Sequence, residues 1–192
     1  MQASDSFINS LYIQTALKMA KLRKFCAYRR LERPYTRKSK YRKLSFIKST
    51  PNSKVVRYEA GNLTKEFPLK VDLISKDPLH IRHNAIESAR LTSHRFLEKS
   101  LGKQGFRLSI RIYPHHILRE NPLASGAGAD RMSTGMKMSF GKAIGMAARV
   151  KPDQALMTVG IEKQHMDIAK RAMKRASYKF PCSCRIAVRE QN

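Results

Sequence analysis

One stretch, residues 114–150, restricts the folds open to this chain more than any other part of its sequence. Within it, roughly two dozen residues rich in Gly, Ser and Met show no apolar periodicity, and structureless loops of that length are either functional or disordered. We therefore expect a long loop over residues 121–145, called the finger loop here, that enters a negatively charged partner. The stretch carries cations along its whole length: Arg119, Arg131, Lys137, Lys142 and Arg149.

The charge of the whole chain favours the same kind of partner. Its 192 residues include 39 Lys and Arg against 14 Asp and Glu, which gives a formal net charge of +25. Such an excess repels itself unless a polyanion relieves it, which makes nucleic acid the expected partner. An anionic membrane surface is a weaker alternative, because the cations are not confined to one face of an amphipathic helix. Trp is absent, so phosphate neutralisation should dominate over base stacking.

Residues 19–57 form a basic arm in which Glu32 is the only acid. A segment with so much like charge does not collapse on its own. Interleaved aromatic residues, with Pro34 and Pro51, favour an extended arm that becomes ordered along an RNA backbone; a solvated charged tail is the alternative. We expect phosphate contacts from the following residues: Arg23, Lys24, Arg29, Arg30, Arg33, Arg37, Lys38, Arg42 and Lys43.

Residues 1–18 differ in composition from everything that follows, with one acid and one base and no pattern of a secretory signal. The sequence becomes abruptly basic at Met19. Our hypothesis is that Met19 is the working start and that residues 1–18 are a non-native or dispensable extension. Mass spectrometry of native N-terminal peptides tests this, and a peptide spanning Leu17 to Leu22 would contradict it.

Residues 58–192 have the pattern of an α+β domain. Alternating apolar residues predict strands, and stripes of apolar residues at helical spacing predict helices. Two successive β-α-β units predict a two-layer sandwich with both helices on one face of a mixed sheet, whose other face meets solvent or RNA. We expect strands at 69–73, 106–112, 157–161 and 185–188, and helices at 77–101 and around 168–176.

The sequence does not support an enzyme. The glycine pair Gly126 and Gly128 lacks the preceding hydrophobic strand and the helix-opening glycine of a nucleotide-binding turn. His115 and His116 are adjacent at a strand end and should point to opposite faces, so they do not form one acid–base site with Asp130. No catalytic residue and no cofactor are therefore expected.

Metal binding is not expected either. The remaining histidines have no ligand spacing with a third donor. Cys182 and Cys184 are separated by a single residue, and no second pair completes a four-ligand site. We interpret these two residues and Cys26 as reduced thiols.

Several short motifs occur together in this chain and are specific as a set. They are Glu66-Phe67-Pro68, Ile81-Arg82-His83-Asn84-Ala85, Arg111-Ile112-Tyr113-Pro114-His115-His116, Leu118-Arg119-Glu120-Asn121, Gly126-Ala127-Gly128-Ala129-Asp130-Arg131, Gly135-Met136, Phe140-Gly141-Lys142 and Ala148-Arg149-Val150. Over residues 19–188 this set resembles the ten-e family of large-subunit ribosomal proteins, the counterpart of the universal sixteen-type protein. Arg82-His83-Asn84 and the absence of a lysine-rich C-terminal tail are similar to the archaeal form.

The resemblance implies a structural constituent of the large ribosomal subunit, in the cytoplasm and without enzymatic activity. It implies contact with large-subunit rRNA near the 5S RNA and the A-site tRNA, with the finger loop reaching toward the peptidyl transferase centre. Added rRNA contacts are expected from Arg82, His83, Arg111, His115 and His116. Near tRNA and the peptidyl transferase centre the resemblance implies Arg119, Asn121, Gly126, Gly128, Asp130, Arg131, Gly135, Lys137, Gly141, Lys142 and Arg149.

The implied partners are large-subunit rRNA, 5S rRNA, tRNA transiently, neighbouring ribosomal proteins and maturation factors, with no membrane and no homo-oligomer. The protein would help to position tRNA and would take part in late subunit maturation. A non-ribosomal nucleic-acid binder explains the charge equally well but not the set of motifs. An enzyme that acts on RNA is a third alternative, and it needs an acid–base pair or metal that the sequence does not show.

Overall fold

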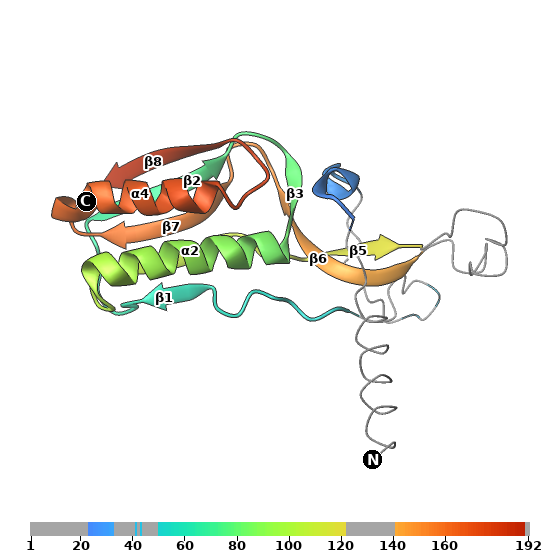
Figure 1. Ribbon diagram of the computed structural model, residues 1–192, viewed down its shortest axis with the longest axis horizontal. Coiled ribbons are helices and arrows are strands. Elements are labelled where there is room, and N and C mark those ends of the chain that lie inside the picture. The colour runs from blue at the N-terminus through green and yellow to red at the C-terminus, as the bar shows by residue number, and fades with distance from the viewer. Residues whose placement is uncertain (1–22, 33–40, 42, 44–49, 122–140, 191–192) are drawn as a thin grey trace, which may run out of the picture.

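Two helices lie side by side on one face of a five-stranded antiparallel sheet (Figure 1). The structure is a computed structural model, and it describes residues 23–32, 41, 43, 50–121 and 141–190. Among these residues, no helix is both long enough and apolar enough to cross a membrane.

The strands form two sheets. The five-stranded sheet has the order β1-β4-β7-β2-β8, from Glu59–Gly61, Arg107–Ile110, Ala155–Ile161, Leu69–Ser75 and Cys184–Glu190. The three-stranded sheet has the order β3-β6-β5, from Leu79–Arg82, Lys142–Val150 and His116–Glu120. The helices are α2 (His83–Leu101) and α4 (Met166–Ser177), with 3-10 turns η1 (Phe25–Tyr28) and η4 (Lys163–His165).

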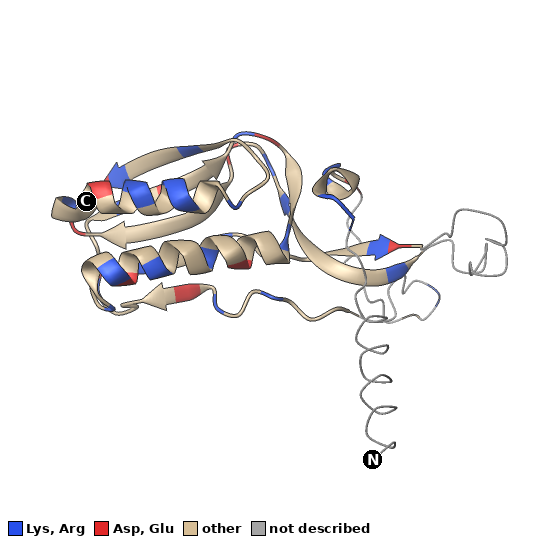
Figure 2. Cartoon of the chain, in the orientation of Figure 1, with Lys and Arg blue, Asp and Glu red and all other residues tan. Residues whose placement is uncertain are grey.

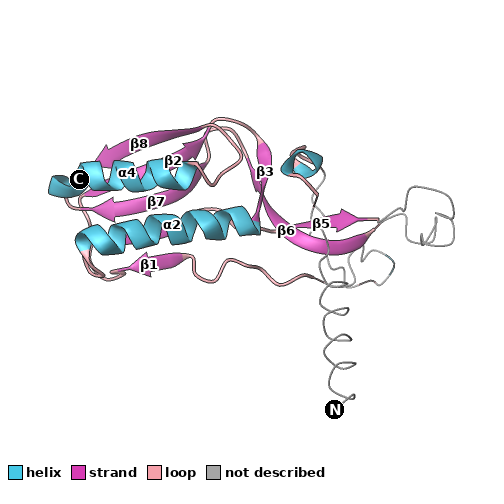
Figure 3. Ribbon diagram, viewed as in Figure 1, coloured by secondary structure: helices cyan, strands magenta, loops and turns pink. Residues whose placement is uncertain are grey.

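The core lies between the helices and the five-stranded sheet, as the sequence periodicity predicts. Val71 and Leu73 of β2 point to the helices and are fully buried. The helix α4 meets them with a stripe of small residues, Ala169, Ala172 and Ala176, which allows it to lie close to the sheet. The expected α+β class, with both helices on one face, is confirmed (Figure 3).

The expectation of a mixed sheet is wrong, because every ladder among the described residues is antiparallel. The strands β2 and β4, which flank the first helix in sequence, run parallel to each other but are separated by β7. Likewise β7 and β8 are separated by β2. Each β-α-β unit is therefore split by a strand of the other, as in ferredoxin-like folds, and all neighbours become antiparallel.

The first helix begins later than the expected residue 77. Residues Leu79–Arg82 form the strand β3, which pairs with β6, and α2 starts at His83. The side chains of Leu79 and Ile81 are buried in the core. Pairing and burial of this short strand prevail over the helix-start signal of Asp77-Pro78.

The β5–β6 hairpin extends beyond the sandwich and carries the ends of the finger loop (Figure 1). Residues 142–145, expected in the loop, belong to β6, where Gly145 pairs with Leu118. The remaining central part of the expected loop, residues 122–140, lies outside the described residues. Asn121 and Gly141, the described residues on either side of this part, therefore lie together at the end of the hairpin.

Candidate nucleic-acid interface

The amino-terminal segment, residues 23–32, packs against the β5–β6 hairpin through Glu120. The carboxylate of Glu120 pairs with the guanidinium of Arg23 and accepts a hydrogen bond from the hydroxyl of Tyr28 at 3.0 Å. Arg82 of β3 donates to the carbonyl oxygen of Arg23 at 3.1 Å and lies over the Tyr28 ring. A single acid in a basic region thus connects part of the arm to the base of the finger loop.

Two buried histidines lie beneath this contact. The rings of His80 (β3) and His116 (β5) are stacked with centroids 4.4 Å apart and planes 9° apart. Nδ1 of His80 is 3.3 Å from the carbonyl oxygen of Tyr28, and its backbone N–H donates to the carbonyl of Arg29 at 3.4 Å. Burial lowers the pKa of His80, and burial together with the nearby positive charges lowers the pKa of His116 to about 4. Both rings are therefore neutral at physiological pH.

This pair makes the domain sensitive to acid. The pKa of His116 is about 4 in the fold, against an ordinary value of 6.5, so the unfolded chain binds the extra proton first as the pH falls. Stability should fall between pH 6.5 and pH 4, by up to about 3 kcal/mol from this group. The variant His116→Phe keeps an aromatic ring and should lose this part of the pH dependence in urea unfolding.

His115, the exposed neighbour of His116, provides a matched control for the urea unfolding experiment. His115→Phe makes the same chemical change outside the buried pair and controls for the added aromatic surface. If His116→Phe and the wild-type chain showed parallel pH profiles, the acid sensitivity would belong to other groups.

Gly141 lies directly before β6 and close to the backbone of Glu120. Its φ is +81°, and a Cβ atom there would come within 2.8 Å of the carbonyl carbon of Glu120. Both the backbone conformation and the close approach therefore require glycine. The positive φ and the contact with Glu120 together explain why a glycine precedes the strand β6.

The substitution Gly141→Ala should destabilise the end of the hairpin by more than backbone strain alone. A non-glycine residue at positive φ costs about 1–2 kcal/mol, and the clash with Glu120 adds to this. Hydrogen exchange of the amides of β5 and β6 should show faster local opening. Gly102→Ala is a matched control, because Gly102 has φ +71° and no atom within 4 Å of the added Cβ. Equal effects of the two substitutions would contradict the close approach.

A second described part of the arm, residues 50–57, packs along the start of α2. The backbone N–H of Lys54 donates to Nδ1 of His83 at 3.3 Å, and that of Val56 donates to Glu87 at 3.3 Å. Val55 is buried in the core. Residues 23–32 and 50–57 of the expected arm therefore both contact the domain.

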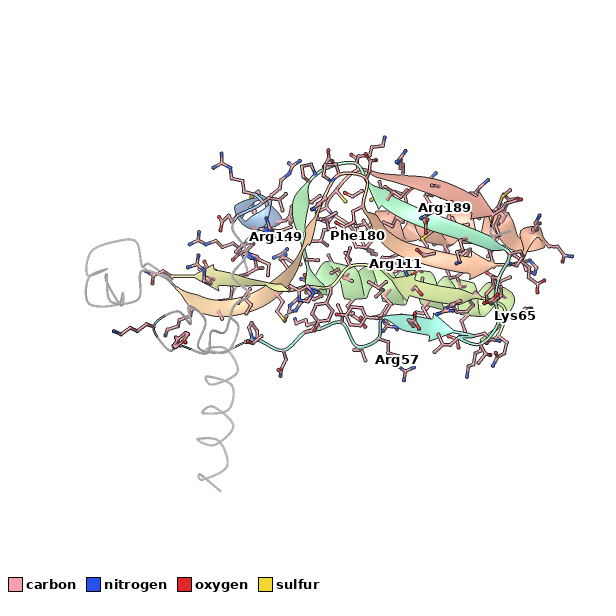
Figure 4. The ribbon with its side chains drawn as sticks, turned by 180° about the vertical axis from the view of Figure 1, so that it is seen from behind. Arg57, Lys65, Arg111, Arg149, Phe180 and Arg189 are labelled. Carbon is pink, nitrogen blue, oxygen red and sulfur yellow. The ribbon has the colours of Figure 1, made fainter. Side chains whose placement is uncertain are left out.

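Figure 2 shows Lys and Arg on β5, on β6 and on the amino-terminal segment, and also along both helices. Arg23, Lys24, Arg29 and Arg30 are exposed on the segment, and Lys142 and Arg149 are exposed on β6. Figure 4 shows Arg149 beside the turn η1, at the same end of the molecule. The arrangement offers several guanidinium groups and amines to a phosphate backbone.

The open face of the five-stranded sheet is less basic than the hairpin end, because acidic side chains there pair with several of its arginines. Asp72 is buried there and accepts hydrogen bonds from Thr158 at 2.6 Å and from Nε of Arg189 at 2.6 Å. Arg107 pairs with Glu59 at 3.2 Å. Figure 4, seen from behind, shows Arg189 and Arg111 on this side. The hairpin end therefore provides a stronger surface for a polyanion than the open face of the sheet does.

The structure places the predicted site residues in three groups. His83 and His116 are buried, so a direct phosphate contact would require the residues around them to move. Arg82, Arg119, Asn121 and Gly141 are partly exposed, whereas the exposed set comprises Arg23, Lys24, Arg29, Arg30, Lys43, Arg111, His115, Lys142 and Arg149. The predictions for Arg33, Arg37, Lys38, Arg42, Gly126, Gly128, Asp130, Arg131, Gly135 and Lys137 lie outside the described residues.

Sequence reasoning missed three residues that build this end of the molecule. The sequence shows Glu120 as an isolated acid between Arg119 and Asn121, and this isolation is the one local signal of its role as an anchor. Tyr28 and His80 carry no sequence signal for their contacts, because these join segments far apart in the chain.

The described residues contain no group of three or more His, Cys, Asp or Glu side chains that could hold a metal ion. Cys26, Cys182 and Cys184 are free thiols. The sulfur atoms of Cys182 and Cys184 are 3.6 Å apart, and the hydrogen bond from Cys184 lowers the pKa of Cys182 to about 7.

A family profile and individual known proteins similar to this chain all belong to one family of ribosomal proteins. The sequence profile of the family described as ribosomal protein L16p/L10e matches residues 33–187. The large ribosomal subunit protein uL16 of Methanococcus maripaludis is 46% identical over 168 residues, which is 87% of this chain and 94% of that protein. The uL16 protein of Archaeoglobus fulgidus is 43% identical over 161 residues, 84% of this chain and 89% of its own length.

Proposed function

The chain belongs to the ribosomal protein L16p/L10e family, and from this premise we propose that the hairpin end of the domain is its principal rRNA-binding surface. As a member of the family it is a component of the large ribosomal subunit, in the cytoplasm, and not an enzyme. Its archaeal relatives agree with the archaeal character of the Arg82-His83-Asn84 motif.

The observation that carries the proposal is the gathering of cations where three segments meet. The amino-terminal segment, β5 and β6 bring Arg30, Arg119 and Arg149 to the end of the molecule from which the finger loop departs. Each phosphate contact made there releases condensed counterions, so affinity for RNA should fall steeply with salt. Recognition of A-form RNA should rest on shape and on 2′-hydroxyl contacts.

The family resemblance supports a finer placement of the chain within the ribosome. The domain lies near 5S RNA and the A-site tRNA, and the finger loop extends from the hairpin toward the peptidyl transferase centre. There it helps to position tRNA, while the RNA performs catalysis. Neighbouring ribosomal proteins and maturation factors are further partners, and the arm, residues 19–57, adds contacts along the rRNA.

Sedimentation of a cell extract in sucrose gradients tests the assignment. The protein, followed by quantitative mass spectrometry, should migrate with the large subunit at near one copy and should remain there at moderately raised salt. Recovery mainly in light fractions, or on DNA after RNase treatment, would contradict the proposal and favour a free nucleic-acid binder.

A further inference from the structure

Two of the three cysteines of this chain come together at the start of β8, an edge strand of the five-stranded sheet (Figure 1). Cys182 lies just before the strand, and Cys184 is its first residue. Their sulfur atoms are 3.6 Å apart, and Sγ of Cys184 also lies 3.6 Å from the carbonyl oxygen of Cys182. Two thiols in contact form a pair whose chemistry differs from that of separate cysteines.

The backbone around this pair is held in place by β2. Cys184 pairs with Ser75 in the β2–β8 ladder, and the carbonyl oxygen of Ser183 accepts a hydrogen bond from the backbone N–H of Lys76 at 3.0 Å. Both cysteine side chains also pack against the hydrophobic core. A disulfide bond is about 2.0 Å long, so the two sulfur atoms need to approach each other by only about 1.6 Å. Rotation of the side chains supplies such an approach while the backbone stays paired.

The contact also makes the two thiols unequal. The hydrogen bond from Cys184 lowers the pKa of Cys182 to about 7, against the opposing effects of burial and of the nearby Asp77 carboxylate. The same hydrogen bond, together with burial, raises the pKa of Cys184. Both side chains are half-buried and Ser183 between them is exposed, so a small solute reaches the pair. The pair therefore combines a nucleophilic thiolate with a thiol that keeps its proton.

We propose that Cys182 and Cys184 are a reversible oxidation site that reacts with hydrogen peroxide. The thiolate of Cys182 attacks one peroxide oxygen, the O–O bond breaks, and a sulfenic acid forms while the released hydroxide takes a proton and becomes water. The sulfur of Cys184 then attacks the sulfenic sulfur. An S–S bond forms, and the hydroxyl group leaves with the thiol proton as a second water. Two electrons thus pass from the two sulfur atoms to the peroxide, and reduction by an external dithiol restores the pair.

The second thiol decides where the oxidation stops. A sulfenic acid either condenses with a neighbouring thiol or is oxidised further to a sulfinic acid, which thiols do not reduce. Cys26 is exposed on η1, and its sequence neighbours Phe25 and Ala27 carry no thiol, so it provides a comparison within the same chain. In the cytoplasm a disulfide of this kind is transient, because cellular thiols reduce it again. Neither Cys182 nor Cys184 belongs to the surface proposed to bind rRNA.

Peptide mass spectrometry of the full chain after treatment with hydrogen peroxide tests the site. Trypsin cleaves after Lys179 and Arg185, so both cysteines lie on one peptide, residues 180–185. After alkylation of the remaining thiols, this peptide should be unlabelled and lighter than its reduced form by two hydrogens, and dithiothreitol should restore it. The peptide that carries Cys26 should show no such loss. A sulfinic acid as the main product on residues 180–185, or a disulfide from this peptide to Cys26, would overturn the proposal.

Two variants separate the roles of the two thiols. Cys184→Ser removes the second thiol and keeps a hydroxyl donor, so Cys182 should be oxidised to a sulfinic acid and the fraction recovered by dithiothreitol should be largely lost. Ser183→Ala is the matched control, because it changes the exposed residue between the cysteines and leaves both thiols in place. Its recovery should equal that of the wild-type chain. Full recovery in Cys184→Ser, or a Cys182 that stays reduced in that variant, would overturn the assignment.

Discussion

Removal of residues 122–140 is expected to leave the domain folded and able to enter the large subunit, but to slow tRNA-dependent peptide synthesis by on the order of 10- to 100-fold. The strands β5 and β6 pair Glu120 with Lys142, so the deletion joins Asn121 directly to Gly141. Asn-Gly is the preferred two-residue connection of a β-hairpin, and Gly141 already has φ +81°. The shortened hairpin therefore keeps the native register.

Three measurements check this result. Urea unfolding should give an unchanged midpoint, gradient sedimentation should show normal entry into subunits, and translation by those subunits should be slow. A variant in which residues 122–140 are replaced by a Gly/Ser linker of the same length separates the loss of length from the loss of sequence. A lower unfolding midpoint would show that the finger loop stabilises the domain, and normal translation would contradict the role at the tRNA that we propose for it.

The substitution Leu73→Ala is expected to lower the free energy of unfolding by about 2–5 kcal/mol. Leu73 is fully buried at the centre of β2, between β7 and β8, and faces the helices. Its truncation removes apolar contacts and leaves a cavity that the surrounding sheet is poorly able to close. Because small domains have total stabilities of about 5–15 kcal/mol, this loss is large.

Ile186 provides the control within the same sheet. It is directly opposite Leu73 in the ladder between β2 and β8, but it is 37% exposed. Ile186→Ala should therefore cost less than about 1 kcal/mol. Chemical denaturation of both variants checks the comparison. Similar losses would show that β8 is as important for the core as β2.

The sequence predicted the elements whose patterns are strong and failed where pairing decides the structure. The alternation of apolar residues along β2 and β7 is clear, and both strands occur where they were expected. The short strand β3 has only four residues and follows Asp77-Pro78, which resembles the start of a helix. The antiparallel order was not predictable from local patterns, because it depends on which distant strands become neighbours.

The candidate site was likewise predictable only where local sequence patterns determine it. The abundance of cations and the position of the finger loop are properties of the sequence itself, and they predict RNA as the partner. The anchor at Glu120 and the stacked pair of His80 and His116 arise only when β3, β5 and the amino-terminal segment meet in space. A histidine that is buried and neutral has the same sequence signal as one that is exposed and ready to contact phosphate.

The interleaved order of the five-stranded sheet also determines when a nascent chain is able to fold. β2 is synthesised early, yet the two strands that flank it, β7 and β8, are among the last to be made. Until β8 emerges from the exit tunnel, β2 has an open edge that invites pairing with other chains. The cations of the arm are meanwhile already outside and able to bind any RNA nearby. The five-stranded sheet is therefore complete only after its last strand has been synthesised.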